Sequence, residues 1–322
     1  MTTYTAPVKD MLFVMKELAD FDEIAKLPGC EELSADLAET ILDEAGKFAT
    51  EVLAPLNATG DRAGNRLQDG VVTTAPGFKD AYRKFTENGW HALAADPEFG
   101  GQGMPYTLAF AVHEMWKSSN LAFSLCPMLT HGAADAIAQH ATAPLKASYL
   151  PKMVSGEWSG TMNLTEPQAG SDLAAVRTRA VPEGDHYRVS GTKIFITWGE
   201  HDCADNIVHM VLARVAGAPE GVKGISLFIV PKFLVNPDGS LGARNDLQCV
   251  SLEHKMGIHA SPTAVMAYGE KQGAIGYLVG EANRGLEYMF TMMNHARLAV
   301  GLEGVAIAER AYQQALSYAR DR

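Results

Sequence analysis

The sequence Gly160-Thr-Met-Asn-Leu-Thr-Glu-Pro-Gln-Ala-Gly-Ser-Asp172 is followed by Gly191-Thr-Lys-Ile-Phe-Ile-Thr-Trp-Gly199, and this pair of segments decides how the chain is interpreted. In the first segment, a strand that ends near Pro167 leads into a turn offering backbone N–H groups and hydroxyls. Gly170 in that turn has no side chain, so a phosphate group can approach the backbone closely. Taken alone, the segment is more typical of an ordinary strand that ends in a turn.

The residues around and after this pair predict β structure. In residues 176 to 180, uncharged side chains alternate with two arginines, and Glu183-Gly-Asp185 turns the chain into a second strand, which predicts a hairpin. Alternating or continuous apolar runs predict further strands at 207–215, 224–231, 250–254, 263–268 and 275–279. We expect an antiparallel β region that begins near Gly160 and ends near Gly280.

The residues before Gly160 have helical spacing instead. Residues 1–33 predict an amphipathic leader helix, followed by a helix at 34–56 and a surface excursion at 57–77. Further helices are predicted at 78–88, 108–117, 132–140 and 143–155.

After Gly280 the helical spacing returns as one long helix. Its apolar stripe needs a partner, because a single helix cannot bury such a face alone. The fold class predicted is α+β, with an N-terminal α-helical domain, a middle antiparallel β domain and the start of a C-terminal α-helical bundle. The predicted bounds are 1–33 for the leader helix, 34–159, 160–280 and 281–322 for these parts.

Composition excludes several classes of protein. The chain has 322 residues, of which 47% are hydrophobic and 20% charged, as in ordinary globular proteins. A formal net charge of −11 disfavours nucleic acid as a partner.

Apolar runs such as 225–230 are far shorter than the roughly 20 residues of a membrane span, and the N-terminus does not resemble a secretory signal. We therefore expect no membrane span and a cytoplasmic protein.

Metal and common nucleotide-binding signatures are not found. The four cysteines are widely separated and the ten histidines show no tight ligand spacing, so no metal is predicted. No dinucleotide-binding glycine fingerprint follows a strand, and there is no phosphate-binding P-loop signature. A nucleotide cofactor would have to be held in another way.

Together with a third segment, Glu98-Phe-Gly-Gly-Gln-Gly103, the pair resembles the acyl-CoA dehydrogenase family in order and setting. The resemblance implies FAD as cofactor. It also implies that the side chains of Met162, Leu164 and Thr165 face the flavin, while Gly170 and Ser171 lie at its diphosphate. Ser171 would also adjoin the acyl-CoA.

In the second segment, the resemblance places Phe195 against the flavin ring system and the hydroxyl of Thr197 near flavin N5. The family often has Trp where Phe195 stands, a difference that keeps the aromatic face and removes an N–H donor. From composition alone, both residues are ordinary strand formers. Arg177 and Lys193 are interpreted as solvated strand charges.

In the last helix, the resemblance implies that Asn294 and Arg297 line the substrate pocket, although Arg297 is equally typical of a surface charge on a helix. Arg322 matches an arginine that reaches the flavin diphosphate of a neighbouring subunit. Some family members carry the catalytic glutamate at the position of Ala296, which cannot act as a base. The carboxylates of Glu287 and Glu303 are nearby, but the helical phase gives no reason to prefer either of them. The catalytic residue therefore stays unknown.

The leader further resembles a long subfamily that includes 3-methylmercaptopropionyl-CoA dehydrogenases, whose chains are nearly twice as long. We therefore expect the sequence to be the N-terminal part of a longer enzyme. The implied activity is FAD-dependent oxidation of an acyl-CoA substrate to the trans-2-enoyl-CoA, with an electron-transfer flavoprotein as acceptor and a homodimer as the assembly.

Two alternatives stay open at this point. An acyl-CoA oxidase would pass its electrons to oxygen, and a non-catalytic fragment would act as an interaction module. The alanine at position 296 favours the fragment.

Overall fold

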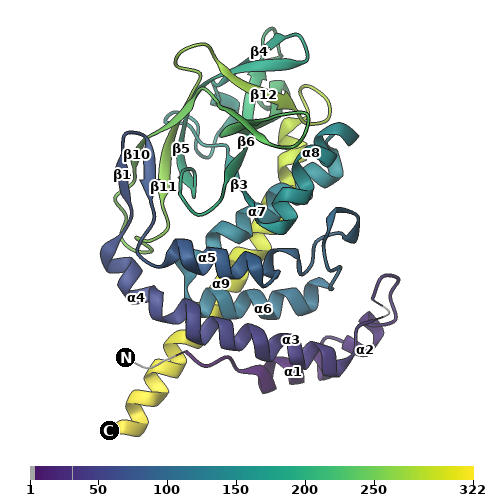
Figure 1. Ribbon diagram of the computed structural model, residues 1–322, viewed down its shortest axis with the longest axis vertical. Coiled ribbons are helices and arrows are strands. Elements are labelled where there is room, and N and C mark those ends of the chain that lie inside the picture. The colour runs from purple at the N-terminus through teal and green to yellow at the C-terminus, as the bar shows by residue number, and fades with distance from the viewer. Residues whose placement is uncertain (1–3, 31) are drawn as a thin grey trace.

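The computed structural model describes residues 4–30 and 32–322. A helical region and a β region lie against each other, and one long C-terminal helix, α9, runs from the β region across the helical one (Figure 1). The α+β class predicted from the sequence is confirmed. Residues 1–3 and 31 of the predicted leader lie outside the described part of the chain.

The helical region precedes the first strand of the main sheet. Its segments are α1 (Val8–Glu17), α2 (Phe21–Ile24), α3 (Ala35–Phe48), the π-helical turn η1 (Ala49–Leu53), α4 (Ala54–Ala63), α5 (Phe78–Glu87), the 3-10 turns η2 (Trp90–Ala92) and η3 (Pro97–Phe99), α6 (Tyr106–Ser119), α7 (Leu121–His140) and α8 (Ala143–Ser155). Side-chain caps mark where two of them begin. The Ser34 hydroxyl accepts a hydrogen bond from Leu37 N (3.1 Å) and the Asn120 amide oxygen from Phe123 N (3.1 Å).

The structure differs from two of the predictions in this region. The helix predicted to stop near Pro55 continues into α4, because proline is tolerated in the first turn of a new helical segment. The predicted surface excursion contains a hairpin, β1 (Arg66–Gln68) and β2 (Val71–Thr73). Asp69 and Gly70 at its turn have φ of 51° and 75°, as a two-residue hairpin turn requires.

The main sheet is formed by β3 (Trp158–Asn163), β4 (Arg179–Glu183), β5 (His186–Thr197), β6 (Asn206–Val215), β7 (Ile225–Pro231), β10 (Leu247–Leu252), β11 (Thr263–Tyr268) and β12 (Ala274–Leu278). Its strand order is β10-β11-β5-β12-β7-β6-β3, with β4 paired to β5 and β6. β8 (Phe233–Val235) and β9 (Leu241–Arg244) form a separate pair, and η4 (Leu173–Ala175) and η5 (Val222–Gly224) are 3-10 turns.

Most pairings in the sheet are antiparallel, as predicted, but β6 runs parallel to β3 and to β4. The β4–β5 hairpin lies between β3 and β6 in the sequence, so the chain enters β6 in the same direction as β3. This crossover cannot be read from the strand pattern alone.

Helix α7 packs directly on β3, the strand that begins the first predicted segment. Gly160 makes this approach possible, because a Cβ there would lie 2.6 Å from the Cβ of Ala133 on α7. Buried residues of α7, α8, β3, β6 and β7 form one core with Met289 and Met292 of α9. The sheet, α7 and α9 are therefore one packed unit.

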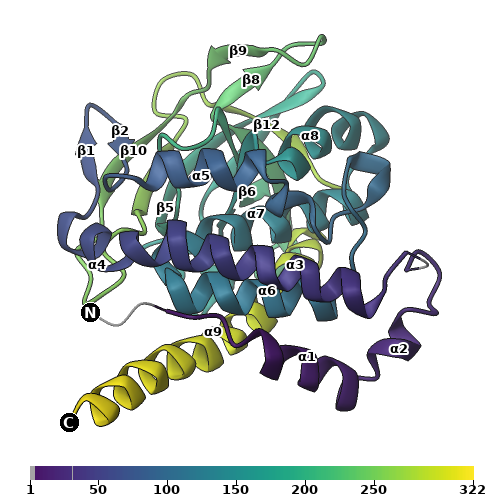
Figure 2. The same cartoon turned by 60° about the horizontal axis from the view of Figure 1, so that its bottom comes forward.

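Helix α9 (Gly285–Asp321) joins both regions. Gly285 lies against the backbone of β7, and further along the helix Glu303 bonds Lys117 of α6 (2.9 Å). The amide of Gln313 bonds Thr5, and beyond that point α9 projects from the body (Figures 1 and 2). Its exposed large apolar side chains include Leu298, Val300, Val305, Ile307, Tyr312 and Tyr318.

Among the described residues, α7 alone is long and apolar enough to fit a membrane span by length and composition. However, 72% of its most apolar window is buried inside the protein, where it contacts α6, α8, α9 and β3. This burial is typical of a core helix.

We predict that Gly285→Ala destabilises the fold by about 1–3 kcal/mol, because the new Cβ would lie 2.1 Å from the backbone carbon of Ser226. Gly301→Ala is the matched control on the same helix. A Cβ there meets no atom within 4 Å, so the change should stabilise the helix by up to about 1 kcal/mol. Urea unfolding of both variants measures the difference, and equal stabilities would contradict the packing described.

Candidate flavin-binding site

The two predicted segments lie side by side, joined by backbone and side-chain hydrogen bonds. Ile194 N donates to Thr165 O (3.0 Å), which links the end of the first segment to β5. The ammonium group of Lys193 donates to Leu164 O (2.9 Å) and to the carboxylate of Glu166 (2.8 Å). The Lys193 and Glu166 side chains are only 0% and 3% exposed, so this ion pair is buried.

Glu166 also closes the loop that follows it. Its carboxylate accepts hydrogen bonds from Arg177 N (2.8 Å), Thr178 N (3.1 Å) and the Thr178 hydroxyl (2.6 Å). Burial opposes ionisation of this carboxyl, but the Lys193 charge and these donors outweigh it and lower the pKa of Glu166 to about 2. Burial lowers the pKa of Lys193 to about 8, against the attraction of Glu166. The pair is ionised at neutral pH.

The interpretation of Lys193 as a solvated charge was therefore wrong, whereas Arg177 is exposed as expected. Neither Glu166 nor Lys193 was among the predicted site residues. One signal for them was present in the sequence, because the first segment carries only negative charges, at Glu166 and Asp172, and the second carries one positive charge, at Lys193.

A β-bulge presents the predicted aromatic residue. Thr197 and Ile196 pair with Thr263 and Ala264 of β11, but the register then shifts, so that β5 gains an extra residue. Phe195 lies in this bulge with φ of 59°, rare for a non-glycine residue, and the residue is 58% exposed. An exposed aromatic ring held by a strained backbone is a feature that concentrates at ligand sites.

Three predicted hydroxyls have no protein partner. Within residues 4–30 and 32–322, the side chains of Thr165, Ser171 and Thr197 form no hydrogen bond. Gly170 and Ser171 are exposed in the loop that Glu166 closes, and a Cβ on Gly170 would meet nothing within 4 Å. An aromatic face, free hydroxyls and an open glycine loop fit a ligand with a flat ring system and a phosphate chain, as FAD has.

The remaining predicted residues divide into two groups. Met162 and Leu164 pack on the same core as Met293 of α9, which brings the first segment next to the predicted substrate segment. On α9, Arg297 bonds the Asn294 side chain (2.9 Å) and lies 5.2 Å from the Phe290 ring centroid.

Arg322 lies beyond the end of α9, about 37 Å along the helix axis from Arg297. It does not join the other predicted residues within one copy of the chain.

Neither nearby carboxylate of α9 is free to act as a base. Glu287 forms a surface ion pair with Arg284 (2.6 Å), whose hydrogen bond lowers the pKa of Glu287. Glu303 is bonded to the buried Lys117. We assign no catalytic base among the described residues.

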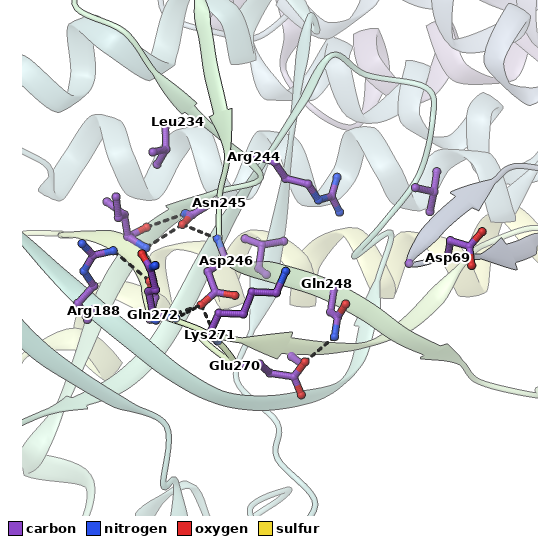
Figure 3. Close-up of a pocket in the computed structure, with 16 residues that line it drawn as sticks. Asp69, Arg188, Leu234, Arg244, Asn245, Asp246, Gln248, Glu270, Lys271 and Gln272 are labelled. Atoms are coloured by element: carbon purple, nitrogen blue, oxygen red, sulfur yellow. Dashed lines mark hydrogen bonds between the residues drawn. The ribbon is translucent and has the colours of Figure 1, made fainter.

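A separate open pocket of ≈ 580 Å³ lies between the β1–β2 hairpin and the turn from β11 to β12. Most of its polar groups bond one another (Figure 3): the Asp246 carboxylate accepts the N–H groups of Lys271, Gln272 and Gly273. It contains none of the predicted site residues. In the part of the chain that the structure describes, no three His, Cys, Asp or Glu side chains are placed to hold a metal ion.

Profiles of two known protein domains match most of the chain. The profile for the acyl-CoA dehydrogenase N-terminal domain matches residues 36–157, and that for the acyl-CoA dehydrogenase middle domain matches residues 161–269. The chain belongs to the acyl-CoA dehydrogenase family.

Among its relatives, 3-methylmercaptopropionyl-CoA dehydrogenase of Ruegeria pomeroyi is 54% identical over 99% of this chain and 54% of its own length. Butyryl-CoA dehydrogenase of Syntrophomonas wolfei is 37% identical with the same coverage. A solved acyl-CoA dehydrogenase of Bacillus anthracis, complexed with FAD, shares the fold with a TM-score of 0.73 and 23% identity, over 91% of this chain and 45% of that one. The chain spans about half the length of the curated relatives it matches.

We predict that Lys193→Met costs about 3–5 kcal/mol of stability, because it leaves the Glu166 carboxylate buried without its counter-ion. Adding Glu166→Gln should recover part of the loss. The control is Lys152→Met, which removes the exposed Lys152–Glu157 pair and should cost no more than about 1 kcal/mol. Denaturant unfolding measures all three variants. Similar losses for the two lysine variants would refute a stabilising role for the buried pair.

The lowered pKa of Glu166 also predicts a pH dependence. A folded-state pKa below the unfolded value of about 4.5 contributes stability that is complete above that pH and is lost as the pH falls toward 2. Wild type should therefore lose stability relative to Glu166→Gln over this window. Unfolding free energies of both proteins at several pH values test this, and parallel curves would contradict it.

Proposed function

We propose that this protein oxidises an acyl-CoA thioester to the trans-2-enoyl-CoA with FAD as cofactor. The observation that carries the proposal is the pair of joined segments: an exposed Phe195 ring on a bulge beside an open glycine loop with free hydroxyls. The family to which the chain belongs and the FAD complex of a protein with the same fold support FAD as the ligand.

Each predicted residue has a physical task in this proposal. Phe195 packs on the flavin ring system, Thr197 donates a hydrogen bond near flavin N5, and Met162, Leu164 and Thr165 face the flavin from the first segment. Gly170 and Ser171 hold the diphosphate through the backbone and a hydroxyl, and Ser171 also adjoins the acyl-CoA. Asn294 and Arg297 orient the substrate from α9.

When bound, the flavin accepts the hydride that leaves the substrate β-carbon. The protein must position that carbon, exclude water, and remove the α-proton with a carboxylate. Ala296 cannot remove a proton, so the residues named here bind and orient, and the base is not among them.

Three further parts of the proposal concern the electron acceptor, the cellular location and the assembly of the protein. We propose that electrons pass to an electron-transfer flavoprotein, that the protein acts in the cytoplasm, and that it works as a homodimer in which Arg322 reaches the flavin of the second copy. The apolar side chains exposed along α9 support association with further protein surface.

An oxidase would pass its electrons to oxygen. Measuring the yield of hydrogen peroxide with the artificial acceptor withheld therefore separates the proposed dehydrogenase from an oxidase.

We predict that Thr197→Val weakens flavin binding and shifts the flavin absorption bands, because valine keeps the volume and removes the hydroxyl. Thr192→Val on the same strand is the control, since Thr192 is an exposed strand residue to which neither cofactor binding nor substrate binding is assigned. Visible spectra and flavin dissociation constants of the purified proteins are the measurements. An unaltered spectrum and turnover in Thr197→Val would count against this placement.

A further inference from the structure

Four of the ten histidines meet inside the helical region, where no role has been assigned to them. His91 of η2, His113 of α6, His131 of α7 and His295 of α9 surround one cavity, together with other side chains that include Tyr106 and Asp135. The ring centroids of His91 and His113 lie 5.5 and 5.4 Å from that of His131. We call this cavity the histidine chamber.

A hydrogen bond fixes the proton position of one of the rings. His131 Nε2 lies 3.0 Å from His91 O, and since a carbonyl only accepts, this nitrogen carries the proton and His131 Nδ1 keeps a lone pair. His295 Nδ1 and the Tyr106 hydroxyl both lie 3.2 Å from one oxygen of Asp135.

Other ring nitrogens in the chamber have no partner. Both nitrogens of His91 and Nε2 of His295 are buried and unbonded within the described residues. His91 is 1% exposed and the His295 side chain 8%. A buried polar atom without a hydrogen-bond partner lowers the stability of a protein. An apolar ring could therefore replace a histidine that only filled space, with no loss of stability.

The chamber suits a neutral guest. Burial lowers the pKa of His91 and His113 well below the usual value and that of His131 to about 4, so these rings are uncharged at neutral pH. A neutral imidazole has one donor and one acceptor. A hydroxyl group, which both donates and accepts, matches these three rings better than an ion or a methyl group.

The volume limits the guest to a small group. The chamber measures ≈ 30 Å³, with ≈ 10 Å³ more between His113, His131 and Met128. This is room for about two water molecules, or for the tip of a chain that carries one hydroxyl.

We propose that the histidine chamber binds the hydroxyl-bearing far end of an acyl chain and so makes the protein selective for acyl-CoA substrates with a polar end. This deepens the proposed function and rests on it. The link is His295, which lines the chamber and lies in the sequence between Asn294 and Ala296 of the predicted substrate segment.

The test compares two thioesters of equal heavy-atom count, 6-hydroxyhexanoyl-CoA and heptanoyl-CoA, with the flavin-loaded protein produced from its own gene. Dissociation constants come from the change in flavin absorbance. Wild type should bind the hydroxylated thioester about tenfold more tightly, the value of one or two net hydrogen bonds. His91→Phe, which keeps a ring and removes both nitrogens, should abolish this preference.

His140→Phe is the control. His140 is on α7, as His131 is, but its ring bonds Thr291 (2.7 Å) and stacks on Tyr288, outside the chamber. Its variant should keep the preference. His91→Phe should also melt no lower than wild type, because it removes unpartnered polar atoms, and this separates lost recognition from lost folding.

A second measurement examines the chamber without any acyl-CoA. Adding 1-butanol should shift the imidazole ¹⁵N resonances that disappear in His91→Phe and His295→Phe. If neither thioester binds but butanol shifts these signals, the proposed function fails and a hydroxyl site remains. Equal binding of both thioesters, or a preference that survives in His91→Phe, would overturn the proposal and leave two ordered waters as the occupants.

Discussion

The buried ion pair between Lys193 and Glu166 holds the candidate site together. One ammonium group bonds a carbonyl and a carboxylate of the neighbouring segment, and that carboxylate receives two backbone N–H groups and a hydroxyl from the far side of its loop. Two segments that are separate in sequence therefore share one set of buried bonds. The cost of burying both charges is recovered only when every partner is in place, which fixes a single arrangement.

The same arrangement explains how exposed groups keep a defined position. Phe195 and the loop around Ser171 face outward, where side chains usually move freely, yet each is anchored within a few residues by buried contacts. Trp198 is fully buried and donates to Ala122 O of α7 (3.1 Å), so the strained stretch of β5 is held at its other end too. A ligand meets a surface that is already shaped.

Sequence reasoning reached the fold class, most helices and strands, and the two segments, because periodicity and turn residues act locally. It missed what depends on distant partners. Lys193 looks like any strand lysine until Glu166 is beside it, and the parallel pairing of β6 depends on chain order rather than on residue type. The β1–β2 hairpin had a local signal in Asp69-Gly70 that was overlooked, and the length of α7 was signalled by its Asn120 cap. The roles of Asn294, Arg297 and Arg322 rest on resemblance, because an exposed side chain on a helix has no pattern that reveals its ligand.

Helix α9 is continuous over 37 residues, or about 55 Å, with its first residue wedged against β7 and its last turns in solvent. The helix therefore joins the sheet to its own last turns as one continuous element, which is held on the way by Lys117 of α6 and by Thr5. A surface that binds the last turns would contact the same helix whose first residue lies against the sheet that carries the candidate site.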